Sequence, residues 1–123
     1  MLRAVLLVGL GGGVGSILRF LTNVLVKKLV DTSFPLHTFV VNLLGCLVIG
    51  LLVGVFERYD IGNSDLRHLL VIGFCGGYTT FSTFALENMQ LVQSGNLALA
   101  FVYIAASVIT GLLAVWLGIC IVK

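Results

Sequence analysis

The sequence predicts an all-α membrane protein with four transmembrane helices. Of its 123 residues, 59% are hydrophobic and only 10% are charged, whereas a typical globular domain has about half apolar and a quarter charged residues. The apolar residues fall into stretches long enough to cross a bilayer, which takes about 20 residues per helix. The predicted helices cover residues 2–26, 36–56, 69–92 and 97–122. Too little chain remains for a soluble domain, so residues 1–123 are expected to form a single four-helix transmembrane domain.

The basic residues give little preference for one orientation in the membrane. With four spans, the two chain ends and the second loop share one side, which carries Arg3, Arg58, Arg67 and Lys123. The other side carries Lys27 and Lys28. Cytoplasmic loops normally hold a clear excess of Lys and Arg, so this weak bias is consistent with insertion in both orientations. The net charge of +2 gives no support for nucleic-acid binding.

The first predicted helix, residues 2–26, is rich in glycine near its start. Its glycines form two GxxxG pairs, Gly9 with Gly13 and Gly11 with Gly15. Such pairs make a flat surface on which another helix backbone packs closely. The spacing does not fit a GxGxxG nucleotide-binding loop, and no strand precedes it.

Arg19 is a charged residue deep inside this first helix. A charge at that depth costs a few kcal/mol in insertion experiments. Two compatible interpretations stay open. The side chain extends toward the polar end near residues 22–28, or it faces a wet vestibule and gives positive potential to an anion.

The second predicted helix, residues 36–56, starts directly after Pro35, which suits a first helical turn. His37 in that turn is interpreted as an interfacial side chain, since no second histidine or cysteine stands at metal-ligand spacing. Asn42 is the one strongly polar residue deeper in this helix. It either joins helices by hydrogen bonding or turns amide N–H donors toward an anion.

The third predicted helix, residues 69–92, contains the stretch GGYTTFSTF at residues 76–84. Two glycines and four hydroxyl side chains weaken a helix where it crosses the membrane, which predicts a break at the midplane. A broken helix exposes carbonyl oxygens at one end and N–H groups at the other, and such ends form ion sites without charged side chains. Phe81 and Phe84 are three residues apart, so both rings are expected on one face. Aromatic ring edges carry partial positive charge that can meet an anion.

Glu87 is the acidic residue within an apolar stretch, and it is interpreted either as a functional carboxylate or as a mark of the approaching interface. In the fourth predicted helix, residues 97–122, Tyr103, Ser107 and Gly111 share one face at a spacing of four. The two hydroxyls on this face, of Tyr103 and Ser107, either join Asn42 in a polar track or bond to carbonyls of their own helix.

No enzyme constellation is present. The sequence lacks GxSxG, HExxH and any pair of neighbouring carboxylates within the apolar stretches. The three cysteines, Cys46, Cys75 and Cys120, are isolated and are interpreted as small apolar residues. We therefore expect no catalysis.

The stretch at residues 76–84 resembles the GGxTTFSTF signature of the CrcB/Fluc fluoride channels. The resemblance extends to Leu18-Arg19-Phe20, to Val41-Asn42-Leu43 and to Glu87, and it covers essentially the whole chain. It implies a fluoride-selective channel in the cell (inner) membrane that passively exports fluoride, lowers cytoplasmic fluoride and protects the cell from its toxicity. It further implies a subunit that inserts in both orientations among membrane lipids and pairs as an antiparallel, dual-topology homodimer.

The same resemblance implies roles for individual residues. Phe81 and Phe84 are expected to face fluoride with their ring edges, and Asn42 to donate beside them. The polar track is expected to contain Ser82, Thr83, Tyr103 and Ser107, with Glu87 close to it. A central sodium ion is expected at the dimer interface, held by the main-chain carbonyls of Gly76 and Thr79 of both subunits. Gly111 stands where family members can carry a serine, and Thr110 or a water is expected to substitute.

Two other functions compete with the channel. A small dual-topology multidrug antiporter requires an acidic residue in its first helix, and residues 2–26 contain none. A structural membrane protein that only assembles with partners accounts for the glycine pairs. It leaves the polar and aromatic residues around the predicted break without a role.

Overall fold

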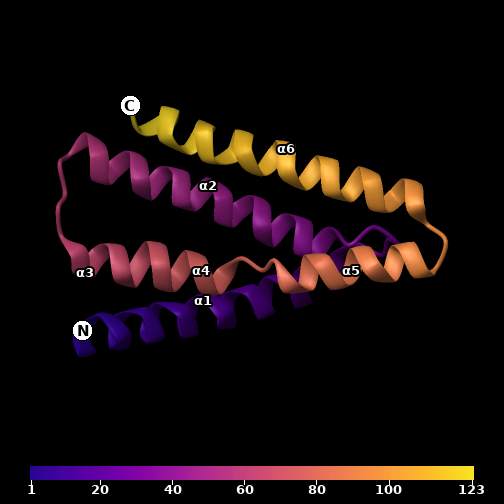
Figure 1. The fold of residues 1–123 in the computed structure, drawn as a ribbon, viewed down its shortest axis with the longest axis horizontal. Coiled ribbons are helices and arrows are strands. Elements are labelled where there is room, and N and C mark those ends of the chain that lie inside the picture. The colour runs from indigo at the N-terminus through magenta and orange to yellow at the C-terminus, as the bar shows by residue number, and fades with distance from the viewer.

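A computed structural model describes residues 1–123 and consists of helices without strands (Figure 1). Four helices or helical segments are long and apolar enough to cross a membrane, which confirms the predicted fold class. The elements in chain order are α1 (Leu2–Leu29), α2 (Leu36–Arg58), α3 (Ser64–Leu66), η1 (Arg67–Cys75), α4 (Gly76–Tyr78), α5 (Ser82–Gln93) and α6 (Leu97–Val122).

The helix limits differ from the prediction mainly at polar ends. Helix α1 continues to Leu29, with Lys27 and Lys28 in its last turn, where positive charge favours the negative end of the helix dipole. The third segment begins at Ser64 because the side chain of Asn63 accepts a hydrogen bond of 2.9 Å from the amide of Asp65. This N-terminal cap adds polar residues to the helix that hydropathy alone leaves out.

The third segment is broken between Tyr78 and Ser82, as the sequence predicts. Thr79 has an extended backbone with φ −82° and ψ 160°, and the helix resumes as α5 at Ser82. The Thr80 hydroxyl accepts a bond of 3.3 Å from the amide of Thr83, which caps the new helix. Before the break, η1 runs as π-helical turns over Arg67–Cys75. Figure 1 shows the break as the thin link between α4 and α5.

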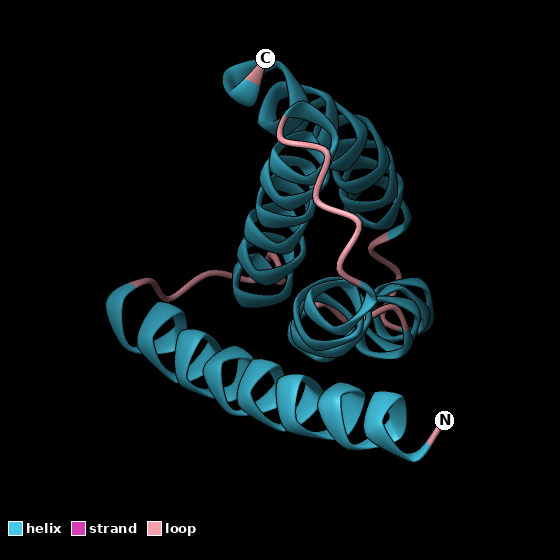
Figure 2. Ribbon diagram, turned by 90° about the vertical axis from the view of Figure 1, so that its left-hand side faces the viewer, coloured by secondary structure: helices cyan, strands magenta, loops and turns pink.

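The helices pack as two pairs that glycine residues bring together. Helix α2 lies against α6, where Gly50 meets the backbone at Val115 and Gly118 meets the backbone at Leu47. Helix α1 lies against η1 and α4. Figure 2 shows α1, which begins at the N label, lying across one side of the other helices.

Only one of the two GxxxG pairs of α1 makes contacts inside the chain. A side chain at Gly11 or Gly15 would collide with the backbone of the third segment. Gly9 and Gly13 have no such neighbour within 4 Å. Close helix packing is therefore confirmed for the pair Gly11 and Gly15, whereas Gly9 and Gly13 point away from the third segment.

Most of the apolar surface of the chain faces outward. Only 17 of 123 residues are buried, so a hydrophobic core of the soluble kind is absent. An outward apolar surface is what hydrocarbon requires of membrane helices, whose backbone groups are satisfied within the helix. Both termini lie at the same end of the molecule (Figure 1), as an even number of spans demands.

Candidate functional site

The break in the third segment is closed by Asn42 of α2. Its Nδ2 donates to the carbonyl of Thr80 at 3.0 Å, and its Oδ1 accepts from the amide of Thr80 at 2.8 Å. Both backbone groups that the break frees at Thr80 are thereby satisfied. The structure thus shows the helix-joining interpretation of Asn42. An amide has two N–H donors, and the second of Asn42 remains for another acceptor in the groove that this residue lines.

Arg19 of α1 also binds the break. Its Nη1 donates to the carbonyl of Thr79 at 3.2 Å, and Ser16 donates to the carbonyl of Gly77 at 3.4 Å. Carbonyls at the C-terminal end of a helix are commonly bound by basic side chains, because that end carries negative partial charge. The guanidinium of Arg19 therefore contacts the third segment directly instead of extending to the polar end of α1.

A groove of about 460 Å³ runs beside the break. It is lined by the predicted fluoride-site residues Asn42, Phe81, Phe84 and Ser107, by the predicted sodium-site residues Gly76 and Thr79, and by neighbours such as Cys46, Cys75 and Val108. The rings of Phe81 and Phe84 lie 5.9 Å apart between centroids, as their spacing predicts. Phe81 is 78% exposed, so this side of the groove is open in the single chain.

Glu87 is the centre of a second cluster, in which two hydroxyl donors and one histidine surround a carboxylate. Its Oε2 accepts from the Thr38 hydroxyl at 2.8 Å and lies 3.2 Å from Nε2 of His37. Its Oε1 accepts from the Tyr103 hydroxyl at 2.9 Å. The side chain of Glu87 is only 13% exposed. Its carboxylate is therefore held by α2 and α6 as well as by its own helix, and it does not simply mark the interface.

Tyr103 connects this cluster to the groove. Its side chain is fully buried, and its ring meets that of Phe84 edge to face, with 4.9 Å between centroids. A ring packed in this way has a fixed orientation, which aims its hydroxyl at Glu87. The aromatic groove and the carboxylate cluster are thus neighbours across a single tyrosine.

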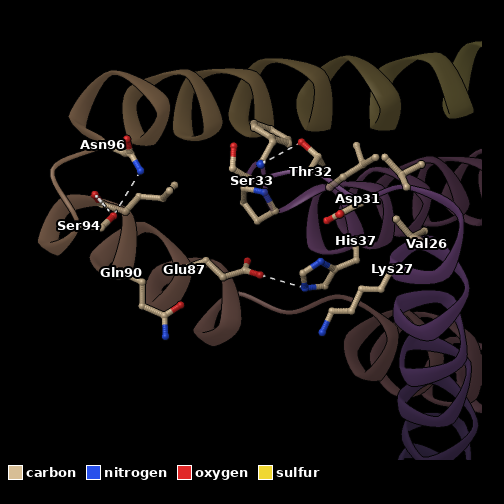
Figure 3. A pocket seen from close by; sticks show the side chains of 15 residues that line it. Val26, Lys27, Asp31, Thr32, Ser33, His37, Glu87, Gln90, Ser94 and Asn96 are labelled. Carbon is tan, nitrogen blue, oxygen red and sulfur yellow. Dashed lines mark hydrogen bonds and ion pairs between the residues drawn. The ribbon is translucent and has the colours of Figure 1, made fainter.

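On its other side the carboxylate cluster opens into a polar vestibule of about 580 Å³ (Figure 3). Figure 3 shows His37 and Glu87 in contact at the wall of this vestibule, with Lys27 below His37 and Gln90 beside Glu87. Asp31 also lines this vestibule. The cavity therefore presents charges of both signs at its mouth.

The remaining predicted track residues have unequal positions. The Ser107 hydroxyl is buried without a partner and lines the groove, so its proton is available to an anion there. The Thr83 hydroxyl accepts from Thr80 at 3.1 Å, and Ser82 is exposed at the start of α5. Thr110 donates to the Ala106 carbonyl of its own helix and does not line the groove. It therefore does not take the place of a serine at position 111.

Sequence reasoning missed three residues of these clusters. His37 was interpreted as interfacial, yet it contacts Glu87. Thr38 and Thr80 were given no specific role, although they bind Glu87 and Asn42. One signal was present for Thr38, because it stands four residues before Asn42 and so shares its helix face.

Comparison with known proteins gives matches along the whole chain. The family model described as CrcB-like protein, Camphor Resistance (CrcB), matches residues 6–119. A protein named fluoride-specific ion channel FluC from Flavobacterium psychrophilum is 48% identical over 122 residues, covering 99% of this chain and 98% of the relative. Relatives of that name from Azobacteroides pseudotrichonymphae and Phocaeicola vulgatus are also 48% identical, each over 118 residues and 96% of this chain, with 94% and 97% of the relatives covered.

Replacing Asn42 tests the contact that closes the break. Asn42→Leu leaves the amide and the carbonyl of Thr80 without partners, and each unsatisfied group costs about 1–3 kcal/mol. We expect the free energy of unfolding in detergent micelles to fall by about 2–4 kcal/mol. The exposed Asn96 is the matched control: its side chain donates only to Ser94 at 3.4 Å, and Asn96→Ala should cost much less than Asn42→Leu. Equal stability of Asn42→Leu and the unchanged protein would contradict this assignment.

Proposed function

The chain belongs to the CrcB family, and we propose that it is a fluoride-selective channel that lets fluoride leave the cell passively. It is a multi-pass membrane protein, and we place it in the cell (inner) membrane. Hydrogen fluoride that has entered a cell ionises at near-neutral pH, so fluoride accumulates inside and flows out through an anion pore. The observation that carries the proposal is the groove where two phenylalanine rings and a free serine hydroxyl meet at a helix break.

The groups in this groove suit a small, strongly hydrated anion. Moving a bare ion into an apolar medium costs tens of kcal/mol, so donors must replace its water one at a time. The second N–H of Asn42 and the hydroxyl of Ser107 are such donors. The ring edges of Phe81 and Phe84 add a weak positive field. None of these groups carries a full charge, so the ion is bound weakly enough to leave again, as conduction requires.

The carboxylate cluster offers the next step for the ion. Thr38 and Tyr103 both donate to Glu87, and a hydroxyl has one proton to donate. A fluoride ion that arrives past Phe84 therefore competes with Glu87 for these protons. Each hydroxyl can rotate to donate either to fluoride or to Glu87. The ion can therefore be bound by these hydroxyls as it leaves the groove and then released into the vestibule.

Fluoride efflux from liposomes is the direct test of this function. Purified protein is reconstituted, and release is followed with a fluoride electrode while chloride release is measured in parallel. We expect rapid release of fluoride without chloride. Phe81→Ile removes an aromatic edge worth about 0.5–1.5 kcal/mol, so fluoride release should slow by about twofold to tenfold or more.

Phe101→Ile is the matched control for that substitution. Phe101 is 73% exposed on α6, similar to Phe81, but it lines neither cavity. Its replacement should leave fluoride release unchanged. Failure of both ions to move through well-folded protein would refute the channel, and equal slowing by both variants would remove Phe81 from the pathway.

We further propose that two copies assemble as an antiparallel homodimer. One chain carries every expected group, and its basic residues favour neither orientation strongly. The groove is open at Phe81, and its rim is apolar. A second copy of opposite orientation covers this face. The helix break of its third segment then lies against the helix break of the first copy.

Cysteine labelling in intact cells tests dual topology. Gly62→Cys lies in the loop between α2 and α3, and Asn96→Cys lies in the turn before α6, at the opposite end of the bundle. In a background with the three native cysteines replaced by alanine, we expect an impermeant maleimide to label about half of the molecules at each position. Complete labelling at one position and none at the other would show a single orientation and refute the antiparallel pair.

We propose a sodium ion at the dimer interface, held by the carbonyls of Gly76 and Thr79 from both subunits. One of these carbonyl oxygens, that of Gly76, lacks its usual helical hydrogen bond and so suits a cation. The amide of Thr80, which would be the helical donor to the Gly76 carbonyl, donates to Asn42 instead. Carbonyl ends of broken helices are known sodium ligands. The Thr79 carbonyl already accepts from Arg19, so it has one lone pair left. A bound cation would supply positive potential to the groove.

Removing sodium tests this site. Protein purified and reconstituted with N-methylglucamine in place of sodium is expected to lose most of its fluoride efflux and to regain it when sodium is added back. The dimer peak in gel filtration serves as the control for folding. Unchanged efflux in protein that was never exposed to sodium would eliminate the proposed ion and leave the channel itself standing.

A further inference from the structure

His37 stands in the first turn of α2, where the fluoride path proposed above opens into the vestibule. Its side chain is 20% exposed, and its Nε2 lies 3.2 Å from Oε2 of Glu87. It lines the vestibule together with Glu87 (Figure 3). Neither the helix break nor the aromatic groove involves this residue. Its contact with the carboxylate is therefore separate from the groups that surround the groove.

The three side chains around the Glu87 carboxylate differ in one chemical property. The hydroxyls of Thr38 and Tyr103 are neutral donors, whereas histidine changes its charge near neutral pH. The Nε2 atom of His37 lies close enough to Oε2 of Glu87 for a charge on the imidazole to act directly on the carboxylate. Protonation of His37 therefore adds one positive charge beside Glu87 and keeps the contact between them.

We propose that His37 is a positioning residue for conduction that acts through Glu87 by setting the net charge of this cluster. The inference rests on the proposed channel function. With His37 neutral, the cluster carries the charge of the carboxylate and repels an approaching anion. With His37 protonated, the two charges offset one another, and the anion approaches more easily. Fluoride conduction accordingly rises as the pH falls through the titration of His37.

Other charged groups around His37 do not produce this dependence. Lys27 of α1 and Asp31 of the following loop line the same vestibule, Glu87 faces His37 from α5, and Tyr103 of α6 contacts Glu87. Among the side chain types that line the vestibule, histidine is the one that ordinarily changes its charge between about pH 5 and pH 8.

The test is fluoride efflux from liposomes with equal pH inside and outside, measured at several values between about pH 5 and pH 8. Equal pH makes the result independent of the orientation of the protein. Hydrogen fluoride crosses lipid unaided, so protein-free liposomes supply the background at each pH. We expect the unchanged protein to conduct roughly threefold faster or more at the acidic end, as the repulsion between the cluster and the anion falls.

Two substitutions at His37 separate charge from structure. His37→Gln keeps a polar side chain beside Glu87 without a titrating charge, and we expect slow efflux with little dependence on pH. His37→Lys keeps a positive charge throughout, and we expect fast efflux with equally little dependence. His68→Gln is the matched control, because His68 lines neither cavity, and it should keep the pH profile of the unchanged protein.

The outcomes distinguish this inference from the channel function. A flat profile in the unchanged protein, or the same slope in His37→Gln, would overturn the role of His37 and leave the channel intact. Absence of fluoride efflux at every pH in all variants would instead refute the proposed function, and the inference would fall with it.

Discussion

The pair of hydrogen bonds between Asn42 and Thr80 is the contact on which the rest of the site depends. In a bilayer no water is available to satisfy a free backbone group, so a broken helix persists only where protein or an ion replaces the missing bonds. Asn42 satisfies both groups of Thr80, and Arg19 binds the carbonyl of Thr79. The break can then hold Phe81 in an exposed position beside a groove. Two polar side chains from different helices thus make an irregular backbone tolerable at this depth.

Glycine residues determine how near these side chains come to the break. Helix α1 packs on the third segment at Gly11 and Gly15, where any side chain would meet backbone. Close approach of the two backbones allows Arg19 to reach a main-chain carbonyl across the helix pair. On the other side, Gly50 and Gly118 bring α2 against α6, so that Thr38 of α2 and Tyr103 of α6 converge on one carboxylate. Small residues far from the site therefore shape it.

Prediction from sequence succeeded where a single helix carries the signal. The adjacent glycines and hydroxyls at residues 76–84 predicted the break, and the spacing of Phe81 and Phe84 predicted neighbouring rings. It failed where a contact joins residues from two helices. His37 lies 50 positions from Glu87, and nothing in the periodicity of either helix indicates that they meet. The sequence also could not indicate which glycine pair of α1 faces another helix. Both pairs have the same GxxxG spacing, and only the packing of the helices shows that Gly9 and Gly13 make no such contact.

By itself the sequence determined the class of protein, the four spans and the place of the break, because hydropathy, helix length and glycine content act within one segment. The similarity of the chain to its family extends over nearly its whole length. Only the tertiary structure decided which polar groups have a hydrogen-bond partner and which have none. Asn42 binds the break, the Ser107 hydroxyl is left without a partner, and Glu87 is surrounded by donors from α2 and α6. A hydrogen bond needs two groups within about 3 Å, and that distance depends on the packing of helices that are remote in sequence.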